Sequence, residues 1–478
     1  MDDPAAIQGR SSSHQMRHFY LFRTNHKSRI ISFPGSLILA VLLTTPALLF
    51  AQATHDSLPS RLTLNQCIDF ALSNQAQVKQ AMIDEEITKK DVRTALSGWY
   101  PQIELDANIQ HYFVAPMTSI PNQLDPSGPP IRYPATSNQT SSGLFLVNQT
   151  LFNSNLYLAA SSSKERRKQA SQNTELTKID TYVGVAKAFY DVLLTEQQLR
   201  VLDEDIVRLQ RNYDDAYNLY KNGITDNIDY QRARIALSNV QAQRRASGES
   251  VKTKYAVLKQ LMGVPPEKKF SVSYDSSRFE NETVTDTAKV PDYKTRVEYQ
   301  QMQTALNLQG ADIRYSRSNF FPSLSAFYEF IPSYGSDQFA SLYSKTSSSS
   351  FVGLKLTYPI FQGLSRFQGL GKARLQYKRL QVGTEYLENV ISSEYTSARS
   401  QYVSNLDQLK VSKENMVIAR NIFNTVKYQY DKGIKAYLEV IVSETDLRTA
   451  ELNYLDMMFR VLSSKLDLEK ALGLIQPK

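Results

Sequence analysis

The chain has 478 residues, enough for two or three ordinary domains, and 42% of them are hydrophobic and 21% charged. These proportions exclude a mainly disordered chain, and the 18 glycines and 18 prolines exclude collagen-like and linker-dominated chains. The mean hydropathy of -0.38 excludes a bundle of membrane-spanning helices. The net charge of +8 falls to +5 without residues 1–53, which is too mild to indicate a nucleic-acid partner.

The first 53 residues predict a secretory signal peptide. Basic residues precede an apolar stretch from Leu37 to Phe50, and the small-residue pattern A-Q-A follows at 51–53. This apolar run of about 15 residues is shorter than the 20 or so that a membrane-spanning helix needs. A retained anchor is the alternative. Met16 offers a second start, which would leave residues 1–15 as an upstream extension.

Residues suited to catalysis or metal binding are scarce after the leader. Cys67 is the single cysteine, so it cannot form a disulfide within the chain, and its helical surroundings predict a buried small hydrophobe. His55 and His111 are the only histidines after residue 53. Because metal sites and most acid–base sites depend on such residues, we expect no metal, no cofactor and no enzymatic activity.

Two parts of the chain repeat each other at an offset of 210 residues. The sequence Y-K-N-G-I at 220–224 returns as Y-D-K-G-I at 430–434. Internal repeats of this kind indicate one structural unit used twice. We therefore expect two tandem repeats, residues 62–266 and 291–476, joined by a linker over 267–290.

Each repeat opens with a helix and continues with a β-hairpin. In the first repeat a helical pattern over 62–97 ends before a proline, after which apolar and polar residues alternate from 102 to 110. Six prolines predict a long loop over 114–139. These patterns predict β-hairpins over 101–152 and 322–361.

Very long helical stretches follow, over 155–221 and 364–431, and neither contains a proline. At 1.5 Å per residue each would span on the order of 100 Å. Apolar residues at steps of three and four predict a coiled-coil seam with a phase break near Leu199, and an ordinary amphipathic helix in a globular bundle is the alternative. The seam of the first stretch comprises Tyr182, Val185, Phe189, Val192, Leu202, Ile206, Leu209, Tyr213, Ala216 and Tyr220.

Glycines stand where these long helices should end. Gly223 and Gly433 follow the last periodic residues, as expected for helix C-caps in the left-handed conformation. Asp226 and Ala436 then open helices that run back along the long ones. Each repeat should therefore carry a tight helical tip.

The alternating strands require a particular environment. One apolar and one polar face per strand, in an exported protein, fit a transmembrane β-barrel. Four strands cannot close a barrel, and an open edge cannot sit in lipid, so several chains must share one wall. The expected fold is therefore mainly α: a coiled-coil helical barrel, with four strands per chain in a shared transmembrane β-barrel.

With this duplicated order the sequence resembles the TolC family of outer-membrane efflux proteins. The resemblance covers residues 62–476 and rests on the aromatic-Pro pairs Tyr100-Pro101 and Phe321-Pro322 and on the paired Y-x-x-G tips. It implies a homotrimer with twelve strands in the outer membrane of a Gram-negative bacterium and an α-helical periplasmic tunnel. It also implies a periplasmic adaptor and an inner-membrane transporter as partners, beside outer-membrane lipid.

The resemblance also assigns residues at the tunnel entrance. Glu439 matches an inward acidic residue of the family's periplasmic constriction, and Asp229 is its counterpart in the first repeat. The family's second acidic position is Val442 here, which weakens the case for a double acidic ring. Solvated helix carboxylates are the alternative. The residues that match the adaptor-docking tip, and that could equally serve only to turn the chain, are Tyr220, Asn222, Gly223, Tyr430, Lys432 and Gly433.

The resulting hypothesis is a passive outer-membrane exit duct of a tripartite efflux or type I secretion system, carrying small molecules. A duct for polypeptides is one alternative, since the lumen need only be wet and wide. An envelope-spanning structural or adhesive coiled-coil protein is the alternative from another class.

Overall fold

The structure is a computed structural model that describes residues 59–123, 127–273, 283, 285–286, 289–290 and 292–477. The expected signal peptide lies outside these residues and stays a prediction, as does the division into repeats and linker. Among the described helices, none combines the length and the apolar character needed to cross a bilayer.

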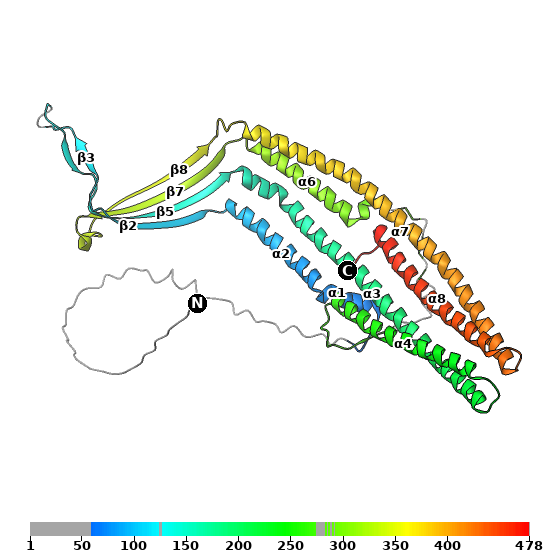
Figure 1. The fold of residues 1–478 in the computed structure, drawn as a ribbon. Helices are drawn as coiled ribbons and strands as arrows, with labels where there is room; N and C mark the ends of the chain where they lie inside the picture. Colours follow the sequence, from blue (N-terminus) through cyan, green and yellow to red (C-terminus); the bar gives the residue numbers. More distant parts are fainter. Residues whose placement is uncertain are drawn as a thin grey trace, which may run out of the picture. The chain divides into compact units, whose positions relative to one another are not determined.

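Four antiparallel strands form one sheet in the order β2-β5-β7-β8 (Figure 1). Their bounds are β2 (Gln102–His111), β5 (Gln139–Phe152), β7 (Ser323–Ser336) and β8 (Thr346–Thr357). The two expected hairpins are thus confirmed as strand pairs. The central pairing of β5 with β7 joins the strands of the first repeat to those of the second.

The register of this sheet places apolar side chains on one face. Leu105 lies opposite Phe145 and Phe145 opposite Phe330, while Tyr328 lies opposite Val352. On this face Leu105 is 74% and Val352 79% exposed. Because directly paired residues point to the same side of a sheet, these residues form one exposed apolar surface that crosses all four strands. Leu144, Leu146, Phe327 and Phe351 lie on the other face, which also carries Glu104, Asp106 and Glu329.

The expected loop over 114–139 is partly wrong, because it contains a second small sheet. Strand β3 (Met117–Ile120) pairs with β4 (Ile131–Pro134) in antiparallel register. Pro116 and Pro121 lie just outside β3, where a missing backbone N–H costs no ladder hydrogen bond. Counting prolines without their positions therefore hid this ribbon.

The single helix expected over 62–97 is two helices, α1 (Leu64–Asn74) and α2 (Ala76–Leu96). Gln75 between them has the extended ψ of 131°, and its side-chain oxygen accepts a hydrogen bond from the Val78 backbone N–H at 2.9 Å. This side-chain cap lets a new helix start one residue after the first ends. Beside α1, β1 (Arg61–Leu62) pairs in parallel with β6 (Ser271–Val272).

The two expected long helices are confirmed as α3 (Ser154–Lys221, 68 residues) and α7 (Ser365–Asp431, 67 residues). Each folds back on a shorter helix, α3 on α4 (Asn227–Met262) and α7 on α8 (Tyr437–Ala471) (Figure 1). Helix α6 (Val297–Ser318) packs against both α3 and α7. Helical hairpins therefore continue the chain from the strands of each repeat.

The core lies between these helices. Val185, Phe189 and Val192 of the expected seam are completely buried, and so is Cys67 from α1. Burial of the expected seam is thus confirmed in the middle of α3, and so is burial of the cysteine in α1. Closer to the tip the buried positions include Asp205 and Asn212, so part of the apolar seam is replaced by polar side chains.

Candidate functional site

The two helical tips have nearly the same backbone turn. Gly223 has φ 70° and Gly433 φ 73°, and in each tip the following isoleucine N–H bonds the carbonyl five residues earlier at 2.9 Å. A Cβ at either glycine would meet no atom within 4 Å. The requirement for glycine is therefore conformational, because other residues rarely adopt a left-handed φ.

The return helices begin with acidic residues, as the sequence predicts. The Asp226 carboxylate caps α4 by accepting from the Ile228 N–H at 2.8 Å, and Asp229 lies in the first turn. Glu439 lies in the first turn of α8 and forms an ion pair with Lys435 at 2.6 Å. Asp229 and Glu439 are thus each stabilised by a helix N-terminus, and Glu439 is also stabilised by the charge of Lys435.

Besides burial, the charge of Asp229 raises the pKa of two tyrosines at the second tip. Burial raises the pKa of Tyr430, and the negative charge of Asp229 raises it further. The pKa of Tyr437 is also raised by burial first, with contributions from Glu444, Tyr430 and Asp229. The structure therefore places Asp229 where its charge reaches the second tip, whereas Glu439 pairs within its own tip.

The six expected docking residues are not equally accessible. Tyr220 is 40% exposed, with its ring centroid 4.8 Å from that of Tyr230. Tyr430 is half-buried, and its ring lies 5.6 Å from that of Tyr437. Lys432 lies over the Tyr428 ring. Tyr430 thus offers less free surface than Tyr220.

Two apolar tip residues were missed by the sequence analysis. Ile224 is 67% and Ile434 69% exposed, directly after the two tip glycines. The signal was present, since isoleucine is the last shared residue of the repeated Y-x-x-G-I pattern. It was read as a marker of the repeat instead of as an exposed apolar pair.

Apolar side chains join the two tips to each other. Ala233 and Val440 are completely buried, with Ala216 and Tyr437 almost so, in one cluster. The Tyr437 hydroxyl has no hydrogen-bond partner within the described part of the chain. This contact fixes the first helical hairpin against the second next to the turns.

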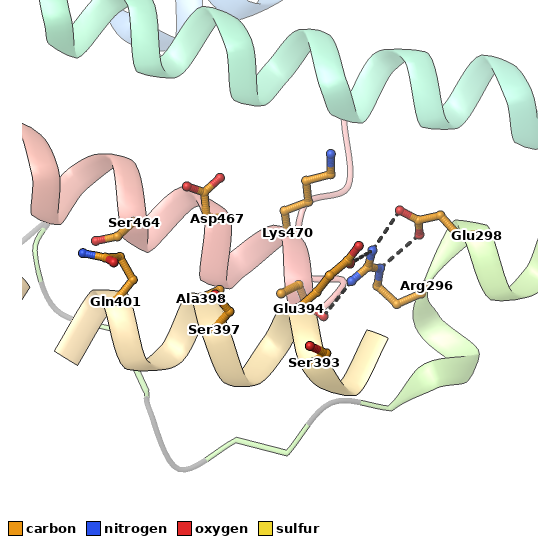
Figure 2. A pocket seen from close by; sticks show the side chains of 11 residues that line it. Arg296, Glu298, Ser393, Glu394, Ser397, Ala398, Gln401, Ser464, Asp467 and Lys470 are labelled. Atoms are coloured by element: carbon orange, nitrogen blue, oxygen red, sulfur yellow. Dashed lines mark hydrogen bonds and ion pairs between the residues drawn. The ribbon is translucent and has the colours of Figure 1, made fainter. Parts of the chain in front are cut away.

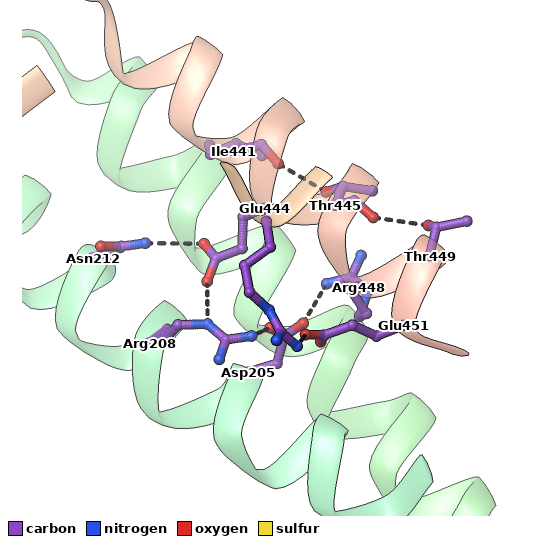
Figure 3. Close-up of polar contacts among 10 residues, drawn as sticks. Asp205, Arg208, Asn212, Ile441, Glu444, Thr445, Arg448, Thr449 and Glu451 are labelled. Carbon is purple, nitrogen blue, oxygen red and sulfur yellow. Dashed lines mark hydrogen bonds and ion pairs between the residues drawn. The ribbon is translucent and has the colours of Figure 1, made fainter. Parts of the chain in front are cut away.

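A buried polar network lies next along the same helices (Figure 3). Asp205 and Glu444 are 0% and 1% exposed, and Arg208 binds both carboxylates. Asn212 donates to Glu444 at 3.0 Å, and Arg448 donates to Asp205 at 3.1 Å. Two carboxylates and two guanidinium groups thus link α3 to α8.

Within this network the Glu444 carboxyl is protonated more readily than an ordinary glutamate. Burial and the nearby Asp205 raise the pKa of Glu444 to about 7, although Arg208 and Arg448 oppose the shift. A carboxyl with this pKa changes its protonation near neutral pH. Because these side chains join α3 to α8 next to the tips, they are candidates for holding the two helical hairpins together.

A cavity of about 590 Å³ lies farther from the tips, between α7, α8 and the start of α6 (Figure 2). Its central cation, Arg296, is 6% exposed and bonds both oxygens of Glu298, the Glu394 carboxylate and the Ala471 carbonyl. With three partners this guanidinium has an evident structural role. Across all the described residues, no group of three or more His, Cys, Asp and Glu side chains could hold a metal ion.

Comparison with known proteins identifies the family. The family model for outer membrane efflux proteins matches residues 67–264 and 295–474. The chain belongs to the outer membrane efflux protein family. The resemblance expected from the duplicated order is thereby confirmed.

Individual members of this outer membrane efflux protein family are distant relatives. The outer membrane protein TolC of Vibrio cholerae is 19% identical over 432 residues, which cover 89% of this chain and 94% of that protein. The solvent efflux pump outer membrane protein SrpC of Pseudomonas putida is 24% identical over 52% of this chain and 53% of its own. The Campylobacter jejuni CmeC outer membrane channel has the same fold, with a TM-score of 0.68, 17% identity, and coverage of 86% of this chain and 85% of that one.

Proposed function

We propose that copies of this chain assemble into an exit duct through the outer membrane for a tripartite efflux system. The observation that carries the proposal is the four-stranded sheet, whose apolar face is uncovered and whose outer strands β2 and β8 pair on one side only. In lipid, every backbone group must be paired, so such edges need partners from further chains. Family resemblance favours three copies and hence a twelve-stranded barrel.

The helical hairpins supply the periplasmic part of this duct. Helices of 68 and 67 residues extend roughly 100 Å, long enough to reach far into the periplasm. Packed side by side around an axis they would continue the lumen of the barrel. Passage through such a duct is passive, so the energy comes from an inner-membrane transporter and no catalytic residue is required.

The tips form the docking surface for the periplasmic adaptor in this proposal. Tyr220, Asn222, Gly223 and Lys432 present exposed or partly exposed surface, and Ile224 and Ile434 add apolar area. Such a mixture of aromatic, apolar and polar groups is typical of protein interfaces. Docking at both tips would let one adaptor grip both helical hairpins.

Asp229 and Glu439 form the acidic entrance of the proposed duct. Repeated by the symmetry of the oligomer, these carboxylates would attract cations to the lumen. Small molecules are the favoured cargo, since the relative SrpC is by name part of a solvent efflux pump.

Single-channel conductance in planar bilayers tests the proposal. Wild-type protein should conduct, and Glu439→Ala and Asp229→Ala should reduce block by multivalent cations from the tip side. Glu385→Ala is the matched control, because this carboxylate is exposed on α7 far from the tip. A wild type that never conducts would refute the duct. Unchanged cation block in both tip variants would refute the acidic entrance alone.

A further inference from the structure

The positive charge of the chain is concentrated on three helix segments next to the sheet. Residues 154–170 of α3, 310–318 of α6 and 365–380 of α7 together contain eleven basic and two acidic side chains, a net charge of +9. The whole chain carries only +8. We call these segments the basic band; its cations are Lys164, Arg166, Arg167, Lys168, Arg314, Arg317, Arg366, Lys372, Arg374, Lys378 and Arg379.

The cations of the basic band are available to a ligand. Ten of the eleven are exposed, and Arg366 is partly buried. Within the described residues none of them forms an ion pair, and Arg366 and Arg167 instead bond backbone carbonyls. Other helices hold a mixture: Lys89, Arg244 and Lys470 have carboxylate partners, whereas Arg232, Arg234 and Arg245 of α4 form no ion pair within the described residues. The basic band is distinguished by the number of such cations close together in the chain. Uncompensated like charges on one surface raise the energy of the chain unless anions neutralise them.

Adjacent copies would not supply these anions. In the proposed barrel β8 of one copy pairs with β2 of the next, which brings the end of α2 beside the start of α7. Residues 85–96 of α2 contain three acidic and three basic side chains, and Lys89 pairs with both Glu85 and Glu86. The neighbour thus adds no net charge, and the band stays basic in the oligomer.

The band lies directly after an aromatic collar at the end of the sheet. Tyr100 and Phe321, which precede β2 and β7, are 69% and 63% exposed, and Phe361 after β8 is 79% exposed. Arg317 is one residue from the end of α6, and Lys372 is seven residues into α7, about 10 Å along its axis. From the strands into the helices, the surface thus changes from apolar to aromatic to basic.

We propose that the basic band binds the headgroups of anionic phospholipids in the periplasmic leaflet of the outer membrane. This inference rests on the proposed function, because it takes the sheet to be the part in the membrane. Apolar, aromatic and basic zones match the hydrocarbon, the interface and the anionic headgroups of a bilayer in that order. Arginine and lysine reach such headgroups with long side chains whose stems stay on apolar surface.

A lumenal path for anionic cargo is the competing use of these cations. The charges on the polar face of the sheet argue against a lumenal path for anions. The acidic residues Glu104, Asp106 and Glu329 lie on this face, and Lys355 is the basic residue there. A lumen built for anions would not continue into acidic strands, since like charges repel at close range. The charge pattern therefore favours lipid.

Measuring the composition of the lipid that stays bound around the full-length protein tests this inference. Protein is reconstituted in vesicles of phosphatidylethanolamine and phosphatidylglycerol at a fixed ratio and excised with its surrounding lipid in polymer discs. Wild type should enrich phosphatidylglycerol over the bulk ratio, and 500 mM NaCl should weaken the enrichment by screening. The triple variant Arg314→Gln, Arg317→Gln, Lys372→Gln should lower the enrichment about threefold or more, because each cation near an anionic surface contributes to binding.

The matched control removes the same charge far from the sheet. Arg232, Arg234 and Arg245 are exposed on α4, and their triple Gln variant should enrich phosphatidylglycerol as wild type does. Equal bulk and bound ratios for wild type, or equal losses in both triple variants, would overturn the inference. A band variant that keeps its lipid but loses anion permeability would show the lumenal alternative. Conductance measured on the same vesicles tests the proposed duct function independently of lipid binding.

Discussion

Asp205 on α3 and Glu444 on α8 are both completely or almost completely buried, and they share the Arg208 guanidinium (Figure 3). Burial and the nearby charge of Asp205 raise the pKa of Glu444, although Arg208 and Arg448 oppose the shift. This pair connects the two helical hairpins near the tips. Its charge state therefore affects how firmly the hairpins hold together.

Because of the raised pKa of Glu444, we expect the free energy of unfolding to fall as the pH rises. Its pKa is about 7 in the folded chain against 4.5 for an ordinary glutamate, so the folded chain binds the extra proton between these values. The resulting stabilisation is complete below pH 4.5 and is lost as the pH rises through 7. At 1.36 kcal/mol per pH unit it amounts to roughly 3 kcal/mol per chain.

Glu444→Gln should remove this dependence, since an amide does not titrate. Thermal unfolding between pH 5 and pH 8 should show wild type losing stability relative to Glu444→Gln as the pH rises. Glu414→Gln, at an exposed carboxylate of α7, should follow the wild-type curve. Parallel curves for wild type and Glu444→Gln would mean that the network holds this carboxyl ionised throughout.

Substitution of the tip glycines should destabilise both turns. Gly223→Ala and Gly433→Ala place a Cβ on a residue with left-handed φ, which costs about 1–2 kcal/mol at each site although no atom obstructs the new methyl. Gly248→Ala is the control, because this glycine lies inside α4 with open space around it and alanine favours a helix. Chemical denaturation should rank both tip variants below wild type and the control at or above it.

Gly353 should be needed for a different reason, which is space. A Cβ at this position in β8 would lie 2.6 Å from the Phe327 ring across the strand pair. Gly353→Ala should therefore cost about 1–3 kcal/mol by overpacking, and Phe327→Ala in the same chain should recover part of that loss. Gly369→Ala, with nothing near its Cβ, should not need such rescue. Additive effects of the first two substitutions, measured by thermal unfolding, would contradict this contact.

Long periodic elements were predictable from the sequence and short interruptions were not. The extents of α3 and α7 were predictable because apolar residues recur at helical spacing without a proline, and because Gly223 and Gly433 mark the helix ends. The break at Gln75 was missed, since glutamine is an ordinary helix residue and its capping role depends on one side-chain hydrogen bond.

The polar network shows a second limit of sequence reasoning. The expected seam is buried at Leu202, Leu209 and Ala216. Ile206 and Tyr213 are only partly buried, and the buried positions next to them are Asp205 and Asn212. A search for apolar residues skips a carboxylate that is buried with partners from another helix. Glu444 lies 236 residues from Arg208 in the chain, so only the packing of α3 against α8 brings their charges together.

The thiol of Cys67 should be inert until the chain unfolds. Its side chain is completely buried in the main core, and burial raises the pKa of the thiol to about 12. Because the thiolate is the reacting species, a neutral-pH maleimide should label native protein far more slowly than protein in guanidinium. Cys67→Ala should abolish labelling in both states and lose stability through the missing sulfur. Rapid labelling of the native protein would show that α1 opens without global unfolding, because no other cysteine is present to react.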